Sequence, residues 1–321
     1  MEERIMIKLG ILGLGKWGLN HLRSLKDIDC QLIGVYDIDK TKKKLSNEYG
    51  VTFFDEYRKL IEKVDAVVVV TPTNTHYDIV KNCLLTGKHV LVEKPIVEDS
   101  ERAIELVKLA KKNNLILSVG YLYRFNNSIK IVKDLLKEIG EIQYITARYI
   151  HSTKPPRRDS GVIMNLGIHV IDILNFVLGI TPVKVYAKKK NLLSKVFEDS
   201  ALIVFDYKDF FATIELSCAH PEKARDMWII AEKEKLYVDY FNQYIIRYPL
   251  KVSYDAVERM EPIRETLQKN EPLKDELRYF VELVDGKHDY KENIGGENYY
   301  TTRLCELSLE SAKAGREMIV E

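Results

Sequence analysis

A histidine near the middle of the chain has the surroundings of a proton acceptor. Asn165, His169 and Asp172 recur at positions i, i+4 and i+7, which share one face of a helix. An imidazole gains and loses a proton near neutral pH, and a carboxylate one turn away fixes its tautomer and supports the imidazolium. The spacing therefore makes His169 a candidate proton acceptor, with Asp172 as its partner. For His169 alone, a polar helix face with a satisfied histidine is the simpler interpretation.

Lys94 is a second candidate for chemistry. It follows an apolar run over residues 89–92 and lies between Glu93 and Pro95. The run predicts a strand of a parallel sheet, and ligands bind at the carboxyl ends of such strands. An ammonium group there donates a hydrogen bond to a substrate oxygen and stabilises an alkoxide as hydride leaves carbon. The alternative is a surface lysine in a loop.

Three glycines near the N-terminus, Gly13, Gly15 and Gly18, have the spacing of a phosphate-binding turn. They follow an apolar run over residues 5–12 and precede a predicted helix that extends to Leu25. The first glycine permits a tight turn, the second lets a pyrophosphate lie against bare backbone, and the third lets helix and strand pack closely. Free N–H groups at the start of the helix favour phosphate. The predicted cofactor contacts are Gly13, Leu14, Gly15, Lys16, Trp17 and Gly18.

A carboxylate follows the second apolar run. Residues 31–36 predict a strand that ends at Asp37, about 20 residues beyond the glycines, where this fold binds the adenosine ribose. Aspartate accepts hydrogen bonds from ribose hydroxyls and repels a 2′-phosphate, so NAD is predicted rather than NADP. The lysines at 40 and 42–44 are close enough to soften this preference, although a solvated helix face explains them better. The alternative is a plain βαβ unit with a surface aspartate.

The first part of the chain alternates strands and helices. Strands are predicted near residues 5–12, 31–36, 51–53, 65–70, 89–92 and 115–119. About six such repeats predict a doubly wound parallel sheet of the α/β class, a Rossmann domain over residues 1–124. Loops at the carboxyl ends of its strands add further predicted cofactor contacts at Thr71, Pro72, Asn74, His76, Glu93 and Lys94.

The pattern changes after residue 124. Helices are predicted near 128–139, 162–178, 273–285 and 297–320, with alternating strands between 142 and 247. Residues 248–272 fit no element well, except for a strand near 251–254. We therefore predict a second, α+β domain over residues 125–321, with an open, mostly antiparallel sheet and helices on one face. Because an open sheet must cover its other face, a homodimer or homotetramer is predicted through it.

Composition narrows the class of protein. The 321 residues are enough for about two domains. With 49 basic and 48 acidic side chains the net charge is +1, and no long basic segment indicates a nucleic-acid partner. Four scattered cysteines without a C-x-x-C pair predict reduced thiols in a cytoplasmic protein and no metal site. No apolar run has transmembrane length and no signal-peptide pattern is present, so no membrane partner is predicted.

Taken together, the motifs resemble the glucose–fructose oxidoreductase and inositol dehydrogenase family (Gfo/Idh/MocA). The resemblance covers essentially the whole chain. It rests on Gly13-x-Gly15-x-x-Gly18, Thr71-Pro72 with His76, Glu93-Lys94-Pro95, residues 120–125, and Gly167-x-His169-x-x-Asp172. It implies oxidation or reduction of a ring carbon of a sugar or cyclitol with NAD or NADP, and it implies that Lys94 and His169 serve catalysis. We expect these two side chains, from separate domains, to converge on one substrate oxygen.

One position departs from the family pattern, and one segment narrows the class of substrate that the resemblance implies. Many members have an aspartate where this chain has Asn165, which hydrogen-bonds a sugar but accepts no proton. The proton relay then rests on His169, with Asp172, or on Lys94. Residues 155–163 resemble members that act on nucleotide-linked amino sugars at C3. Arg157, beside a second arginine, suits a diphosphate or a carboxylate, although an exposed basic loop explains the pair equally well.

The expected function is an NAD-dependent dehydrogenase of a sugar, cyclitol or nucleotide sugar. Tyr123 and Arg124 join Lys94, Arg157, Asn165 and His169 as predicted substrate contacts. Three alternatives stay open at this point: an NADPH-dependent reductase of a keto sugar, a non-catalytic regulator that senses NAD, and an enzyme that uses NAD transiently to hydrolyse a glycosidic bond. The presence of both Lys94 and His169 argues against the regulator.

Overall fold

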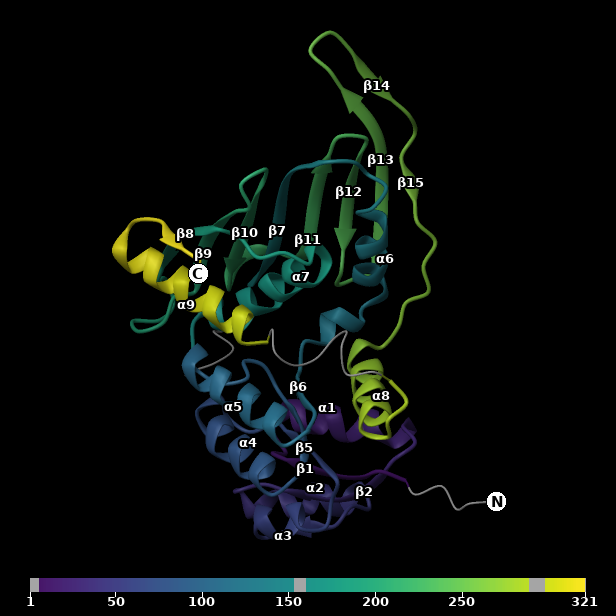
Figure 1. Ribbon diagram of the computed structural model, residues 1–321, viewed down its shortest axis with the longest axis vertical. Helices are drawn as coiled ribbons and strands as arrows, with labels where there is room; N and C mark the ends of the chain where they lie inside the picture. The colour runs from purple at the N-terminus through teal and green to yellow at the C-terminus, as the bar shows by residue number, and fades with distance from the viewer. Residues whose placement is uncertain (1–5, 153–159, 289–297, 321) are drawn as a thin grey trace. The chain divides into compact units, whose positions relative to one another are not determined.

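The computed structural model describes residues 6–152, 160–288 and 298–320 (Figure 1). The chain divides into two compact units. Unit 1 comprises residues up to Leu122 together with Leu273–Thr302, and unit 2 comprises Tyr123–Pro272 together with the residues from Arg303 onward.

Unit 1 is built on a parallel sheet of six strands in the order β3-β2-β1-β4-β5-β6. The strands are β1 Lys8–Leu12, β2 Gln31–Tyr36, β3 Phe53–Phe54, β4 Ala66–Val69, β5 His89–Val92 and β6 Leu117–Val119. This arrangement confirms the predicted doubly wound sheet. The order reverses between β1 and β4, and ligands bind at the carboxyl ends of the strands at such a switch point.

Helices surround this sheet because its strands are apolar on both faces. Every residue of β4 is buried, as expected for a central strand of a covered parallel sheet. The helices are α1 Lys16–Ser24, α2 Lys43–Glu48, α3 Tyr57–Ile61, α4 His76–Leu85, α5 Ser100–Lys112 and α8 Pro272–Val284. Side chains of α8 pack in the same core as β1 and α1. Sequence analysis assigned the residues of α8 to the second domain.

Unit 2 carries a ten-stranded sheet in the order β14-β13-β12-β11-β7-β10-β9-β8-β16, with β15 beside β13. The strands are β7 Ile142–Ser152, β8 Lys184–Lys190, β9 Ser200–Asp206, β10 Phe211–Ser217, β11 Ala219–Ala231, β12 Glu234–Asp239, β13 Tyr244–Val252, β14 Val257–Arg259, β15 Ile263–Arg264 and β16 Met318–Ile319. Among the described strands of this sheet, only the β7–β10 pair is parallel, which confirms the predicted, mostly antiparallel sheet.

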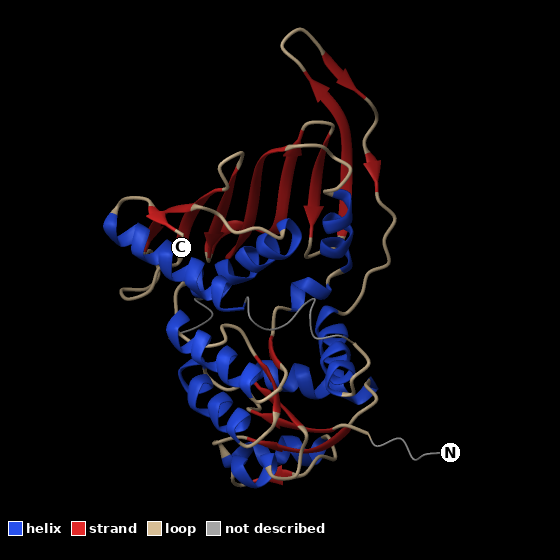
Figure 2. Ribbon diagram, viewed as in Figure 1, coloured by secondary structure: helices blue, strands red, loops and turns tan. Residues whose placement is uncertain are grey.

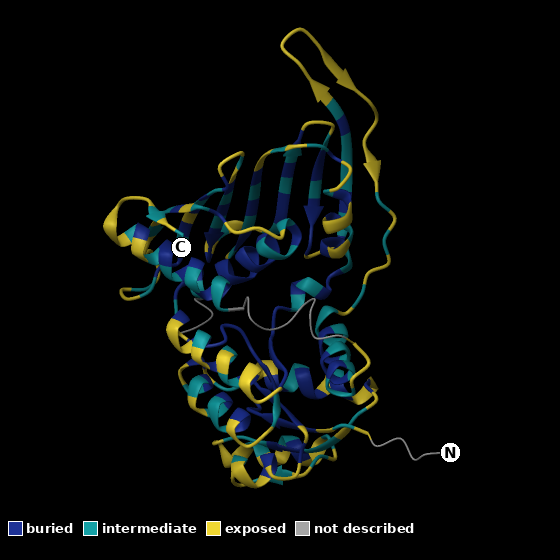
Figure 3. Ribbon diagram, in the orientation of Figure 1, coloured by how far each residue is buried: buried dark blue, intermediate teal, exposed yellow. Residues whose placement is uncertain are grey.

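Burial alternates along β7 because its two faces meet different surroundings (Figure 3). Ile145, Ala147 and Tyr149 are buried on the face that packs against helices. These helices are α6 Asn127–Leu135, α7 Ile168–Leu178 and α9 Asn298–Ala314 (Figure 2). On the opposite face, the rings of Tyr144 and Phe211 stack at 5.6 Å and are 37% and 45% exposed.

Three stretches of unit 2 differ from the sequence prediction. The helix expected over 162–178 opens with a π turn, Ile163–Gly167, before α7 begins. The last helix ends at Ala314, because Gly315 adopts a positive φ of 72°, and the chain then adds β16 to the sheet. The unassigned stretch after residue 248 instead forms an extended arm of β13, β14 and β15 (Figure 1). The β8–β16 pairing joins segments far apart in the sequence, and β14 and β15 are exposed throughout, so hydrophobic periodicity reveals neither.

Candidate active site

In the glycine turn between β1 and α1, neighbouring backbone leaves no room for a side chain at two of the three glycines and leaves open space at the third. Gly13 has a φ of +107°, and a Cβ added there would lie 2.5 Å from the carbonyl oxygen of Val70. A Cβ on Gly18 would collide with the carbonyl oxygen of Gly13. At Gly15 a Cβ would meet no heavy atom within 4 Å. The chain itself therefore requires the first and third glycines, whereas the second leaves bare backbone beside open space, as a bound pyrophosphate needs.

The start of α1 is suited to an anion. Gly15 occupies the N-cap position, so no side chain caps the helix, and its first turn holds no acidic residue. The first N–H groups of a helix have no partner within the helix, and the helix dipole places partial positive charge there. Lys16 and Trp17 are exposed at this end, whereas Leu14 is buried in the core. These residues fit the phosphates of a dinucleotide.

Asp37 joins the end of β2 to the glycine turn. Its Oδ2 accepts a hydrogen bond from the backbone N–H of Leu14 at 2.6 Å, and its Oδ1 accepts one from Asp39 at 2.8 Å. The carboxylate is half-buried. The structure thus brings together Asp37 and the glycine turn, which the sequence placed in one cofactor site. The residues present fit NAD.

His76 contacts the backbone of two of the predicted cofactor loops. Its Nδ1 lies 2.9 Å from the carbonyl oxygen of Pro95, and its Nε2 lies 2.8 Å from that of Thr71. The side chain is fully buried, whereas Asn74 and Pro72 in the same loop are exposed. His76 therefore holds the loop after β4 to the loop after β5. Its predicted contact with the cofactor stays a prediction.

Glu93 and Lys94 are both buried at the end of β5, and each is 7% exposed. The Oε1 of Glu93 lies 2.8 Å from Nε2 of His21 on α1, and its Oε2 accepts a hydrogen bond from the backbone N–H of Lys94 at 3.2 Å. Burial acts to raise the pKa of Glu93, but the hydrogen bond and charge of His21, with the charge of Lys94, hold that pKa below its ordinary value. The Lys94–Pro95 peptide is cis.

His21 is a residue that the sequence reasoning missed. It is fully buried on α1, and it ties the helix of the glycine turn to the carboxylate beside Lys94. A histidine next to Leu22 on the buried face of α1 was the available signal, but its partner is 72 residues away in the sequence. Gly120 permits this packing, because a Cβ there would lie 3.2 Å from Oε2 of Glu93.

In unit 2, aromatic rings surround His169. The ring of Tyr123 meets the imidazole edge-to-face with centroids 5.2 Å apart, and the ring of Tyr149 stacks on it at 6.0 Å. His169 is 6% exposed. Burial, with the neighbouring Tyr123, raises the pKa of Tyr149 well above its ordinary value, so this phenol stays neutral. The structure thus brings Tyr123, a predicted substrate contact, to the side of His169.

Asp172 and Arg124 form a buried ion pair. Nε of Arg124 donates to both carboxylate oxygens at 3.1 and 3.0 Å, and Nη2 donates to Oδ1 at 2.5 Å. The side chains are 2% and 11% exposed. Sequence analysis expected Asp172 to support His169 and Arg124 to bind substrate. The structure adds the contact between the two predicted site residues, and their roles in catalysis and binding stay predictions.

Asn165 lies in the π turn that precedes α7. Its N–H donates to the carbonyl oxygen of Gly161 at 3.1 Å, and its side chain is 6% exposed. Glu198 anchors the turn, because its Oε1 accepts the N–H of Ile163 at 3.1 Å. Such π turns are rare and occur often at functional sites. Arg157, with the neighbouring residues 155–159, lies outside the described residues.

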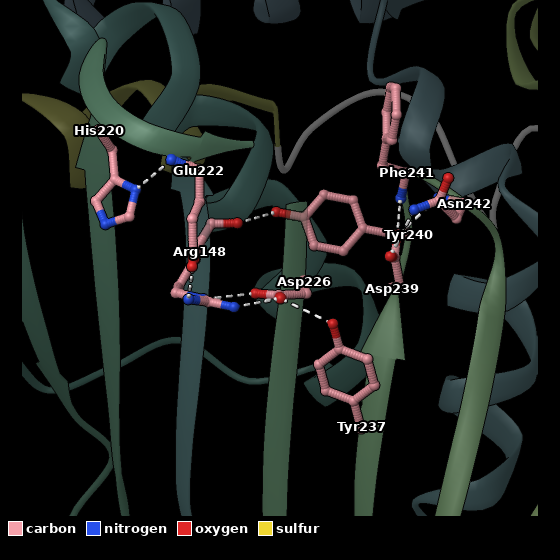
Figure 4. Close-up of polar contacts among 9 residues, drawn as sticks. All are labelled: Arg148, His220, Glu222, Asp226, Tyr237, Asp239, Tyr240, Phe241 and Asn242. Atoms are coloured by element: carbon pink, nitrogen blue, oxygen red, sulfur yellow. Dashed lines mark hydrogen bonds and ion pairs between the residues drawn. The ribbon is translucent and has the colours of Figure 1, made fainter. Parts of the chain in front are cut away.

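On the other face of the sheet, an ion pair supports the loop after β12 (Figure 4). Arg148 contacts Asp226 at 2.9 and 2.6 Å, and the hydroxyl of Tyr237 donates to the same carboxylate at 3.0 Å. The hydroxyl of Tyr240 donates to the carbonyl oxygen of Arg148 at 2.9 Å. Asp239 accepts the backbone N–H groups of the two residues after Tyr240. These contacts fix the position of Tyr240, whose ring packs against Tyr123.

Residues 6–152, 160–288 and 298–320 contain no group of three or more metal-binding side chains. They contain no helix with the length and apolar character needed to cross a membrane. All four cysteines lie in this part of the chain and form no disulfide.

Two family models match the chain. One, described as an oxidoreductase family with an NAD-binding Rossmann fold, matches residues 7–121, and the other, the GFO/IDH/MocA C-terminal domain, matches residues 130–237. Among curated relatives, UDP-N-acetylglucosamine 3-dehydrogenase of Acidithiobacillus ferrooxidans is 32% identical over 57% of this chain and 58% of its own length. Inositol 2-dehydrogenase of Rhizobium meliloti is 30% identical over 60% of this chain and 62% of its own length. These matches thus span less than two thirds of each relative.

Solved structures share the fold along nearly the whole chain. That of the Acidithiobacillus ferrooxidans UDP-N-acetylglucosamine 3-dehydrogenase has a TM-score of 0.84 at 26% identity, covering 97% of this chain and 98% of that one. An Agrobacterium radiobacter oxidoreductase in complex with NAD+, L-tartaric acid and magnesium has a TM-score of 0.83 at 19% identity, covering 98% of each chain. The two family models together match well over half of this chain, with an NAD-binding fold, so the chain belongs to the Gfo/Idh/MocA oxidoreductase family.

Proposed function

We propose that this protein is an NAD-dependent dehydrogenase that oxidises a ring carbon of a sugar, and that its substrate is a nucleotide sugar such as a UDP-N-acetylamino sugar oxidised at C3. The observation that carries the proposal is the bare backbone at Gly15 beside Asp37, in a unit that also holds the buried Lys94. The matched Acidithiobacillus ferrooxidans enzyme supports the choice of sugar.

The proposed chemistry divides between the protein and its cofactor. NAD, when bound, accepts the hydride from the substrate carbon. His169 accepts the proton of the substrate hydroxyl, and its aromatic surroundings limit access of water to the imidazole. The ammonium group of Lys94 donates a hydrogen bond to the same oxygen and stabilises the negative charge that develops there. Asn165 binds a sugar hydroxyl and takes no part in proton transfer.

The test is a panel of sugars, cyclitols and UDP-sugars incubated with NAD+ or NADP+. NADH absorbance and chromatography of the sugar product are both recorded. We expect NADH formation with a UDP-N-acetylamino sugar and a keto-sugar product. Release of free sugar without net NADH would instead indicate glycoside hydrolysis, and NADPH-dependent loss of a keto sugar would indicate a reductase. Tight NAD binding without turnover of any member would support a regulator.

We also propose that the open face of the unit 2 sheet forms a homodimer or homotetramer interface, in a cytoplasmic protein. This face exposes apolar and aromatic side chains, including Tyr144, Leu202 and Phe211 at 37%, 49% and 45%. Exposed apolar patches of this kind mark association surfaces. Sedimentation of the wild-type protein and of Phe211→Asp is the test. A monomeric wild-type protein at micromolar concentration would contradict the proposal.

A further inference from the structure

Cationic side chains gather beside the aromatic rings that contact His169. Arg225 on β11 lies opposite Tyr149 on β7 in the sheet register, and its guanidinium carbon is 4.5 Å from the centre of that ring. The same carbon lies 4.9 Å from the ring centre of Phe241. Nζ of Lys223 lies 4.0 Å from the centre of that same Phe241 ring. We call Arg225 and Lys223, together with the imidazole of His151 that lies beside Tyr149, the cationic cluster.

Short contacts connect this cluster to the predicted proton acceptor. Nη1 of Arg225 donates a hydrogen bond to the hydroxyl of Tyr123 at 2.9 Å. The rings of Tyr123 and Tyr149 both contact the imidazole of His169, with centroid distances of 5.2 and 6.0 Å. The guanidinium of Arg225 and the imidazole of His169 therefore contact the same two aromatic side chains.

The cluster lacks a negative partner within the described part of the chain. No described carboxylate forms an ion pair with Arg225, Lys223 or His151, and Nε of Arg225 is buried without an acceptor there. Two other arginines of the same sheet are paired: Arg148 with Asp226, and Arg247 with Glu234. A partly buried guanidinium without an anion is costly, because its lost hydration is not replaced. Burial, and then the charges of Arg225 and Lys223, lower the pKa of His151, as expected in an electropositive site.

We propose that Arg225, assisted by Lys223, binds an anionic group of the substrate, a phosphate or a carboxylate, and so selects charged sugars over neutral ones. This inference rests on the proposed dehydrogenase function and adds the substrate feature that the site recognises. Guanidinium groups bind both kinds of anion through paired hydrogen bonds. The stacking on Tyr149 and Phe241 holds the guanidinium plane in place before the anion arrives.

The kinetic experiment uses the full-length protein with NAD+ and sugars that differ only in charge: a UDP-sugar, a uronic acid, and the neutral parent sugar. Arg225→Gln is expected to lower kcat/KM for the charged substrate by about 10- to 100-fold, mainly through KM, and to lower it less for the neutral sugar. Arg225→Lys keeps the positive charge but removes the paired N–H donors of the guanidinium, so an intermediate loss of kcat/KM is expected. Lys233→Gln is the matched control, because it deletes an exposed positive charge in the turn between β11 and β12.

A binding experiment separates this inference from the proposed function, because it needs no turnover. The NAD-saturated protein is titrated calorimetrically with UDP, with glucuronate and with methyl glucoside. Weaker binding of UDP alone in Arg225→Gln assigns the site to phosphate, and weaker binding of glucuronate alone assigns it to carboxylate. Equal weakening of charged and neutral ligands, or no weakening of either anion, would overturn the inference. A wild-type protein that binds anions through Arg225 but oxidises no sugar would refute only the proposed function.

Discussion

Each unit holds one predicted catalytic residue beside one buried carboxylate, but the two carboxylates are neutralised differently. In unit 1, Glu93 precedes Lys94 and contacts the imidazole of His21 at 2.8 Å. In unit 2, Asp172 lies one turn after His169 and contacts Arg124, which stays charged at all ordinary pH values. The carboxylate near Lys94 therefore meets an imidazole, whereas the carboxylate near His169 meets a guanidinium that donates to both of its oxygens.

The largest expected effect comes from breaking the pair in unit 2. Arg124→Met leaves the carboxylate of Asp172 buried without its guanidinium partner. Loss of one member of a buried ion pair costs about 3–5 kcal/mol, so the free energy of unfolding is expected to fall by that amount in urea titration. The double variant Arg124→Met with Asp172→Leu should recover part of the loss, since it leaves no buried charge. A loss below about 1 kcal/mol in the single variant would mean that the pair is solvated.

The next largest effect is expected at Lys94 and His169, the two residues proposed for catalysis. Lys94→Ala and His169→Ala are each expected to lower kcat by about 100-fold or more while NAD still binds. The reason is the loss of a hydrogen-bond donor in one case and of the proton acceptor in the other. Steady-state kinetics and a fluorescence titration with NADH measure the two quantities. Near-normal turnover in His169→Ala would remove the proposed mechanism.

The pair in unit 1 gives a prediction about acid stability. The pKa of Glu93 lies below its ordinary value of 4.5 in the folded protein, so the unfolded chain binds the proton more readily. The ionised carboxylate therefore adds stability above about pH 4.5, and this contribution is lost as the pH falls through the lowered pKa. Glu93→Gln should be less stable by about 1–3 kcal/mol at pH 7, and its deficit should shrink in acid. A deficit independent of pH would contradict the assignment.

The smallest effect is expected at the ribose end of the cofactor site. Asp37→Ala removes a carboxylate that accepts the N–H of Leu14 and is placed to accept ribose hydroxyls. We expect NADH to bind about 10-fold more weakly, as measured by fluorescence titration. Asp55→Ala is the control, because that carboxylate is exposed and lies outside the cofactor loops. Equal affinities in all three proteins would exclude Asp37 from the cofactor site.

The parallel sheet and the glycine turn were predictable because their signals are local. The apolar runs of β1, β2, β4 and β5 are visible in the sequence, and the glycine spacing follows directly from the geometry of one turn. The π turn before α7 was not predictable, since its residues show the spacing of an α-helix. The contacts of Glu93 with His21 and of Asp172 with Arg124 join residues 72 and 48 positions apart. No periodicity connects such positions.

The sequence alone determined the fold class, the cofactor turn and the two residues proposed for chemistry, because each depends on residue types within a few positions of one another. Tertiary structure decided which carboxylate meets which cation, and it left Arg225 without a described acidic partner beside the rings around His169. The physical reason is that burial and charge pairing depend on strands and helices that meet only after folding. Local patterns show which groups are present, whereas packing decides which of them are neutralised.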